Sequence, residues 1–241
     1  MSAASDKFEK DVAANANKIP GIKAERPVVG TQYSDVRLKY KNQSTWLEVK
    51  MSHSDNLSNP RCFYKDQKWH TTYTTPAAKV AVDLLNDSRQ TKNFLKDLSK
   101  FTGIPMKSLK IPTTKGGLQE EGAVPLHIMK MYFEQPGINR YIALQENFNM
   151  GKLVTEHYTI GKAEPAYYMQ AGDDFYRISN KDPFKVGRKI PLLSGNGDFK
   201  VRVATRSQFY EVQAEIKITS MPDSKYSLKP NTNKLNPFLV E

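Results

Sequence analysis

Two carboxylates and a lysine, Asp35, Glu48 and Lys50, have the types and spacing to do chemistry on a phosphodiester. Glu48 and Lys50 are separated by one residue, so on a strand they share a face and lie about 6.7 Å apart along it. Asp35 falls on the strand expected to pair with theirs, so the two carboxylates can converge on one hard cation, which prefers oxygen ligands. A bound metal ion polarises a phosphoryl oxygen and lowers the pKa of bound water, and a nearby ammonium activates that water or offsets developing negative charge. These residues therefore fit metal-assisted hydrolysis of a nucleic-acid backbone.

A helix and three short strands are expected to position these residues. The helix is predicted over residues 6–17, with acidic residues in its first turns. Three short segments rich in β-branched or aromatic residues predict strands at 27–31, 34–40 and 44–50. In the last strand Leu47 and Val49 point to one face, and Glu48 and Lys50 point to the other. The carboxylate and the ammonium are therefore expected on the same side of the sheet.

These motifs resemble those of the PD-(D/E)XK nuclease superfamily, whose members have the restriction-endonuclease-like fold. Ser34-Asp35-Val36 is similar to the first acidic motif, with Ser where Pro is commoner, and Glu48-Val49-Lys50 is similar to the second. Phe8-Glu9 resembles the helix-borne acid that many members use as a further metal ligand. Gly30-Thr31 is similar to the loop before the aspartate in junction resolvases. The resemblance covers about residues 5–88, from the first helix through three strands to the following helix.

The resemblance implies an α+β fold with an α/β core and a mixed sheet flanked by helices. The β-rich C-terminal part of the expected fold comes from the strand patterns of residues 146–241 and not from the resemblance. It also implies a metal-dependent DNA endonuclease of the restriction type or of the homing, mobile-element type. Asp35 and Glu48 would hold Mg²⁺, with Mn²⁺ as a substitute, Glu9 would assist directly or through water, and Lys50 would activate water or stabilise charge. The choice of DNA over RNA follows from the resemblance alone. Double-strand cutting would require a homodimer or two successive nicks.

After Lys50 the sequence pattern is first irregular, then helical, then β-rich. Residues 51–75 are polar and interrupted by Asn and Pro, which predicts a long loop. Helices are predicted from Pro76, over the apolar stripe from Phe94 to Phe101, and after Pro125. The helix from Pro76 has a wide apolar face and is expected to be buried against the sheet. Strands are predicted at 141–145, 153–160, 167–170, 175–178, 199–204 and 209–219. We therefore expect a nuclease core with a helical insertion over residues 1–145, and a β-rich region over 146–241 that binds DNA or extends the sheet.

Polar and basic side chains outside the motif suit contacts with phosphate groups or base edges. The predicted nucleic-acid-binding residues are Ser52, Asn56, Asn59, Arg61, Lys65, Lys200 and Arg202. Lys200 and Arg202 alternate with Val201 and Val203, so they project from one strand face. Two plainer interpretations stay open. The loop side chains could satisfy the loop's own backbone, and the basic strand could be a sheet edge protected by Lys and Arg.

The composition is that of a globular chain with a strong basic excess. Its 241 residues are 39% apolar, and 36 Lys and Arg against 25 Asp and Glu give a formal charge of +11, which favours nucleic acid or an anionic membrane as partner. No apolar run approaches the roughly 20 residues of a membrane span, so no membrane partner is expected. Single Cys62 excludes an intrachain disulfide and indicates a reducing, cytoplasmic setting, and the four histidines show no metal-binding spacing. Gly116-Gly117 lacks the ending of a phosphate-binding loop, so no nucleotide cofactor is expected.

Two alternatives to a duplex endonuclease remain. A structure-selective nuclease such as a Holliday-junction resolvase would keep the fold and change the substrate. A non-catalytic basic nucleic-acid-binding protein would carry Glu48 and Lys50 as a surface pair, since exposed strands often alternate Glu and Lys. DNA binding alone does not separate these hypotheses, whereas metal-dependent cleavage does.

Overall fold

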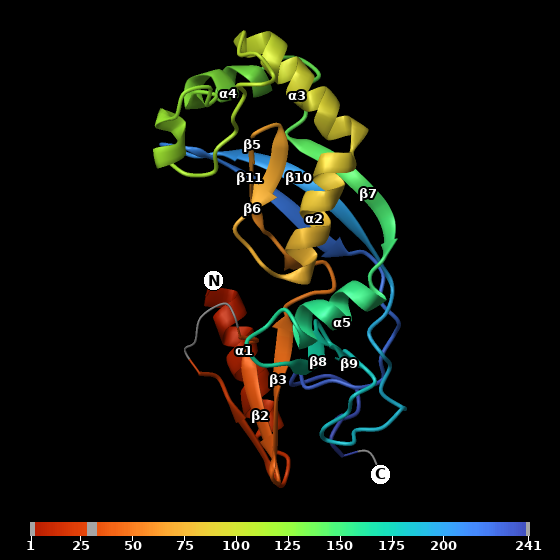
Figure 1. Ribbon diagram of the computed structural model, residues 1–241. Coiled ribbons are helices and arrows are strands. Elements are labelled where there is room, and N and C mark those ends of the chain that lie inside the picture. The colour runs from red at the N-terminus through yellow and green to blue at the C-terminus, as the bar shows by residue number, and fades with distance from the viewer. Residues whose placement is uncertain (1–2, 28–32, 240–241) are drawn as a thin grey trace. The chain divides into compact units, whose positions relative to one another are not determined.

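The computed structural model describes residues 3–27 and 33–239, which form two compact units (Figure 1). The first unit comprises Met1–Asp55, Asn149–Asn196 and Ile218–Glu241, and the second comprises Asn56–Phe148 and Gly197–Lys217. The units interleave along the chain, whereas the sequence suggested two consecutive regions divided after residue 145. The difference arises because strands that follow residue 165 join the sheet formed by the N-terminal strands.

The first unit is a five-stranded mixed sheet with a helix on each face. Its elements are α1 (Ala3–Ala16), β1 (Ile22–Glu25), β2 (Val36–Tyr40), β3 (Gln43–Lys50), α5 (Gly151–Thr159), β8 (Ala166–Ala171) and β9 (Asp174–Arg177). The strand order is β1-β2-β3-β8-β9; β3 and β8 are parallel, and the other neighbours are antiparallel. The predicted α+β class, with a mixed sheet flanked by helices, is confirmed.

The alternation of β3 decides what each helix covers. Leu47 and Val49 belong to the apolar core that also contains Val12 of α1. Glu48 points to the opposite face, where it contacts Tyr158 of α5. The two helices therefore cover opposite faces of the sheet, and the face beneath α5 carries the charged residues.

Two of the predicted strands, at 27–31 and 153–160, belong to this unit. The strand predicted at 27–31, with Gly30-Thr31, lies largely outside the described residues; β1, which was not predicted, pairs with β2 at the sheet edge. The strand predicted at 153–160 is wrong, because this segment is helix α5. Its β-branched residues favoured a strand, but Leu153, Val154, His157 and Tyr158 are buried with helical spacing.

The second unit combines a second sheet with three α-helices. Its elements are β4 (Asn56–Ser58), β5 (Arg61–Lys65), β6 (Lys68–Thr71), α2 (Pro76–Asp87), α3 (Arg89–Thr102), the 3-10 helix η1 (Gly116–Gln119), α4 (Leu126–Phe133), β7 (Tyr141–Asn149), β10 (Asn196–Thr205) and β11 (Tyr210–Ile218). The strand order is β6-β5-β11-β10-β7, and β4 also pairs with β11. The three predicted helices are confirmed, and Pro76 begins α2 directly after the capping residue Thr75. No helix within the described ranges is long and apolar enough to cross a membrane.

Two expectations for this part of the chain are corrected. The predicted loop at 51–75 contains three short strands, β4, β5 and β6. The polar composition of this segment had indicated a loop. The helix after this segment, α2, was expected against the sheet of the N-terminal strands, and it packs on β6 within the second unit. In the first unit, helix α5 covers the sheet face that carries Glu48. Residues 56–148, which lie between β3 and α5 in the chain, form most of the second unit, so the chain returns to the first sheet only at α5.

Candidate active site

Asp35 lies immediately before β2, across from β3. Its Oδ2 accepts a hydrogen bond from the backbone N–H of Val49 at 2.8 Å. The antiparallel register pairs Val36 with Leu47, so Asp35 stands one step further along, at the level of Glu48. The hairpin therefore brings the two predicted carboxylates to adjacent strands, as the sequence indicated.

Glu48 is buried, with 4% of its surface exposed, and its two oxygens have different surroundings. Oε1 lies 2.8 Å from Lys50 Nζ and accepts a hydrogen bond from the Tyr158 hydroxyl at 3.3 Å. Oε2 is also buried, but within the described residues it accepts no hydrogen bond. Lys162 Nζ lies 3.9 Å from it, which is ion-pair distance and too long for a hydrogen bond.

The electrostatics of the site give Asp35 a pKa near neutral pH and keep Glu48 and Lys50 charged as an ion pair. Burial, and then the negative charge of Glu48, raises the pKa of Asp35 to about 7, although the Val49 N–H and Lys50 oppose this. Burial also disfavours the ionised form of Glu48, but the charges of Lys50 and Lys162 outweigh it and hold its pKa below the ordinary value. Burial opposes the charge of Lys50, yet Glu48 outweighs it and raises the lysine pKa. Lys50 is therefore a cation at neutral pH, which suits charge stabilisation better than proton abstraction.

This donor set fits a hard divalent cation. A buried carboxylate oxygen without a hydrogen-bond donor is costly unless something binds it. The mutual repulsion that raises the pKa of Asp35 is the interaction that a cation between two carboxylates would relieve. Asp35 and Glu48 are thus the residues that would hold Mg²⁺ or Mn²⁺.

Glu9 has other partners. Its Oε1 accepts a hydrogen bond from Ser5 at 3.1 Å, and its Oε2 lies 2.6 Å from Nε of Arg26. Glu9, Asp35 and Glu48 also do not form a group whose ligand atoms all lie within 4.8 Å of one another. These contacts make Glu9 an anchor for Arg26 and give no support to direct metal coordination, which stays a prediction.

The predicted nucleic-acid-binding side chains divide between the units. Ser52 is in the first unit, where its hydroxyl lies 2.8 Å from that of Ser54 and donates to Asp55. Asn56 and Asn59 are in the second unit, and Asn56 Nδ2 donates to Asn59 Oδ1 at 2.8 Å. The Ser52 hydroxyl also accepts a hydrogen bond from the backbone N–H of Ser54, in agreement with the plainer interpretation that the loop side chains satisfy the loop's own backbone, whereas the Asn56–Asn59 bond joins two side chains.

The basic candidates of the second unit mostly have acidic partners. Arg61 lies 2.9 Å from Glu211, Arg202 lies 2.9 Å from Glu215, and Lys200 lies 3.8 Å from Asp198. Lys65 is exposed at the end of β5. Along β10 alternate residues, Gly197, Phe199, Val201 and Val203, are buried, so Lys200 and Arg202 share the other face, as predicted. Contact with nucleic acid by these residues stays a prediction.

Sequence reasoning missed Tyr158 and Lys162, which both approach Glu48. Tyr158 was placed on a strand, and only the helical spacing of the buried residues in α5 could have identified its face. Lys162 follows the helix in a short turn, and nothing in its spacing distinguishes it from other surface lysines.

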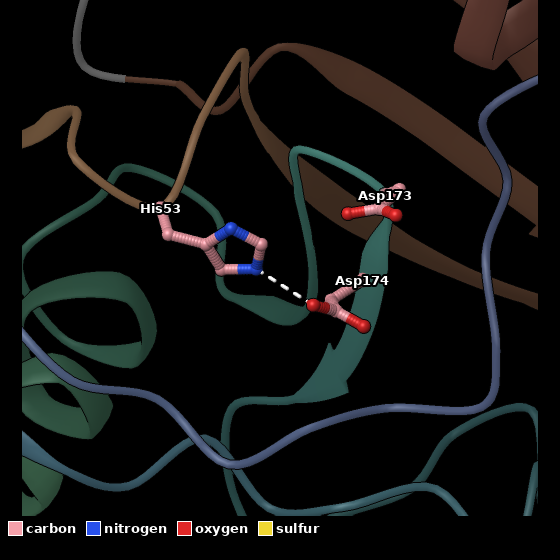
Figure 2. A group of neighbouring side chains, drawn as sticks. All are labelled: His53, Asp173 and Asp174. Carbon is pink, nitrogen blue, oxygen red and sulfur yellow. Dashed lines mark hydrogen bonds and ion pairs between the residues drawn. The ribbon is translucent and has the colours of Figure 1, made fainter.

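A second polar cluster lies in the same unit and is shown in Figure 2. His53 comes from the loop after β3, Asp173 comes from the turn between β8 and β9, and Asp174 is the first residue of β9. It is the one group of three His, Cys, Asp or Glu side chains within residues 3–27 and 33–239 whose ligand atoms all lie within 4.8 Å of one another. His53 Nε2 lies 2.7 Å from Asp174 Oδ2.

The ammonium of Lys234 already supplies a cation to this cluster. Lys234 forms an ion pair with Asp174 and lies 3.6 Å from Asp173. Asp174 Oδ1 also accepts a hydrogen bond from the backbone N–H of Ser224. Since Asp174 has hydrogen-bond partners on both oxygens and Lys234 offsets one of the two carboxylate charges, the cluster fits a metal ion less well than the Asp35–Glu48 pair does.

Comparison with known proteins gives little further information. No family model matches the chain, and no curated protein matches its sequence. One solved structure, HhaI endonuclease in complex with DNA, aligns with 89% of this chain and 91% of its own at 12% identity, with a TM-score of 0.29. A TM-score this low does not establish a relationship between the two proteins.

Proposed function

We propose that this chain is a divalent-metal-dependent DNA endonuclease of the PD-(D/E)XK type. The observation that carries the proposal is the pairing of Asp35 with Glu48, whose buried Oε2 accepts no hydrogen bond from the described residues, beside the ammonium of Lys50. Isolated surface pairs of Glu and Lys do not have this burial. The net charge of +11 supports a polyanionic substrate, and DNA as that polyanion rests on the motif resemblance.

The residues of the site have separate roles in this proposal. Asp35 and Glu48 would hold Mg²⁺, which when bound supplies a polarised phosphoryl oxygen and a water of lowered pKa. Lys50 stays protonated and stabilises the negative charge that develops on the phosphodiester. Tyr158 donates to Glu48 Oε1 and so fixes the carboxylate rotamer. One chain offers one such carboxylate pair within its described residues, so a double-strand break would use two copies or two successive nicks.

The test is cleavage of supercoiled, linear and four-way-junction DNA at one fixed salt concentration, with Mg²⁺, Mn²⁺ or EDTA. The wild type, Asp35→Asn, Lys50→Met and the control Lys152→Met are compared; Lys152 is 87% exposed on α5. We expect metal-dependent cleavage by the wild type and the control, and at least a hundredfold lower rate in the two site variants, since each removes a group that stabilises the transition state. Preference for junctions would support a structure-selective nuclease. Equal behaviour of all four proteins on every substrate would leave a non-catalytic binding protein as the better account.

A further inference from the structure

Lys162 lies in the site but belongs neither to the motif of Asp35 nor to the motif of Glu48 and Lys50. Its side chain is 13% exposed, and its Nζ donates to the carbonyl of Tyr33 at 3.4 Å and lies 5.6 Å from the ring centre of Tyr158. It therefore links the segment just before Asp35 to the helix that covers Glu48.

The two lysines near Glu48 act on different oxygens. Lys50 lies at hydrogen-bond distance from Oε1, which Tyr158 also contacts. Lys162 is 3.9 Å from Oε2 and neutralises it through space without using its lone pairs. The oxygen that remains available as a metal ligand is thus the one that faces a second ammonium group.

This arrangement affects two kinds of ligand in opposite ways. A cation on Oε2 is repelled by the nearby ammonium, whereas a phosphate group that enters the site attracts it. We propose that Lys162 couples divalent-cation binding to DNA binding: it weakens the cation site of the free protein, and it ceases to do so when its charge is shared with a phosphate. The proposal rests on the function proposed above and adds a regulatory role for a residue outside the motif.

Thermodynamic linkage makes the proposal measurable without catalysis. The coupling factor is the ratio of the Ca²⁺ dissociation constants without and with a short DNA duplex, and the same factor must describe the effect of Ca²⁺ on duplex affinity. We expect a factor of about ten in the wild type, within the usual range for coupled sites. In Lys162→Met, Ca²⁺ should bind the free protein more tightly, by about threefold or more, and the coupling factor should fall toward one.

Calorimetric Ca²⁺ titrations at fixed salt would compare Lys162→Met with three further proteins. Lys162→Gln is a second neutral variant whose amide can still donate to Tyr33, Lys162→Arg keeps the charge, and Lys152→Met removes an exposed charge near α5. The arginine variant and the Lys152 control should keep the wild-type coupling. Near-ultraviolet circular dichroism establishes that each variant is folded.

The outcomes separate the two proposals. If the wild type binds Ca²⁺ in a manner lost in Asp35→Asn, but both neutral Lys162 variants match the wild type, the role of Lys162 is refuted and the metal site stands. If no Ca²⁺ binding depends on Asp35, the metal site is wrong and the coupling proposal falls with it. Loss of coupling in Lys162→Arg would also refute the electrostatic argument.

Discussion

Replacing Asp35 by asparagine should stabilise the metal-free protein at pH 8, and by a smaller amount at pH 5. Asparagine has the same shape, and its carbonyl oxygen can still accept the hydrogen bond from Val49 N–H. It lacks the negative charge that burial and Glu48 disfavour. The substitution therefore removes an electrostatic cost of the folded protein and leaves the packing almost unchanged.

The magnitude follows from the difference in pKa between the folded and unfolded states. The pKa of Asp35 is about 7 in the folded protein, against an ordinary value of 3.8. Between these values the folded state holds a proton that the unfolded state has released, so the free energy of unfolding falls as pH rises and the loss is complete above pH 7. At about 1.4 kcal/mol per unit the ceiling is about 4 kcal/mol. We expect a loss of about 2 kcal/mol, because the protein around the two carboxylates relaxes and water enters, which weakens their repulsion.

Urea unfolding in EDTA at pH 5 and pH 8 measures this effect. The chain has two tryptophans, Trp46 in β3 of the first unit and Trp69 in β6 of the second. A Trp69→Phe background leaves the fluorescence of Trp46 as a reporter of the unit that contains Asp35. Trp69 Nε1 is buried and donates no hydrogen bond within the described chain, so phenylalanine removes none there.

Asp35→Asn and the exposed control Asp223→Asn would be compared with the parent at both pH values. The expected result is a gain of about 2 kcal/mol for Asp35→Asn at pH 8 and a smaller gain at pH 5, because the folded parent is then protonated at Asp35 and only the ionisation of the unfolded chain above pH 3.8 favours unfolding. His157, whose pKa burial lowers to about 4, is present in every variant and cancels from the comparison. A gain at pH 8 no larger than at pH 5, or one shared by the control, would refute the charge repulsion on which the metal site rests.

Two further predictions concern the second unit. Cys62 is fully buried, and burial raises its pKa to about 12. The native protein should therefore not react with a thiol reagent at pH 8, whereas the urea-unfolded protein should react within minutes. Prompt reaction of the native protein would contradict the packing of β5. Glu211 is 2% exposed and lies 2.9 Å from both Arg61 and Arg206, so Glu211→Gln should lower the free energy of unfolding by about 1–3 kcal/mol. The fluorescence of Trp69 during urea unfolding would measure it, with the exposed Glu121→Gln as control. Equal stabilities would show that the two ion pairs of buried Glu211 with its half-exposed arginines contribute nothing.

Part of this architecture follows from local sequence patterns. The alternation in β3 places Glu48 and Lys50 on one face, and the adjacent strand with its short turn places Asp35 beside them. Helices α2 and α3 follow from their capping residues and apolar stripes, and α4 follows from its apolar residues after Pro125. These features depend on contacts between residues close in the chain, which is why the sequence was sufficient to predict them.

The remaining features depend on contacts that a sequence pattern does not encode. Tyr158 meets Glu48 across a separation of 110 residues, and Glu9 is held by Arg26 through folding of the helix against the first strand. Helix α5 was mistaken for a strand because its β-branched residues satisfy both patterns until the surface that buries them is known. The sequence by itself determined which residues form the carboxylate pair and its lysine. Only the tertiary structure decided which helix covers them and that Lys162 adds a second charge, because both depend on strands and helices brought together from distant parts of the chain.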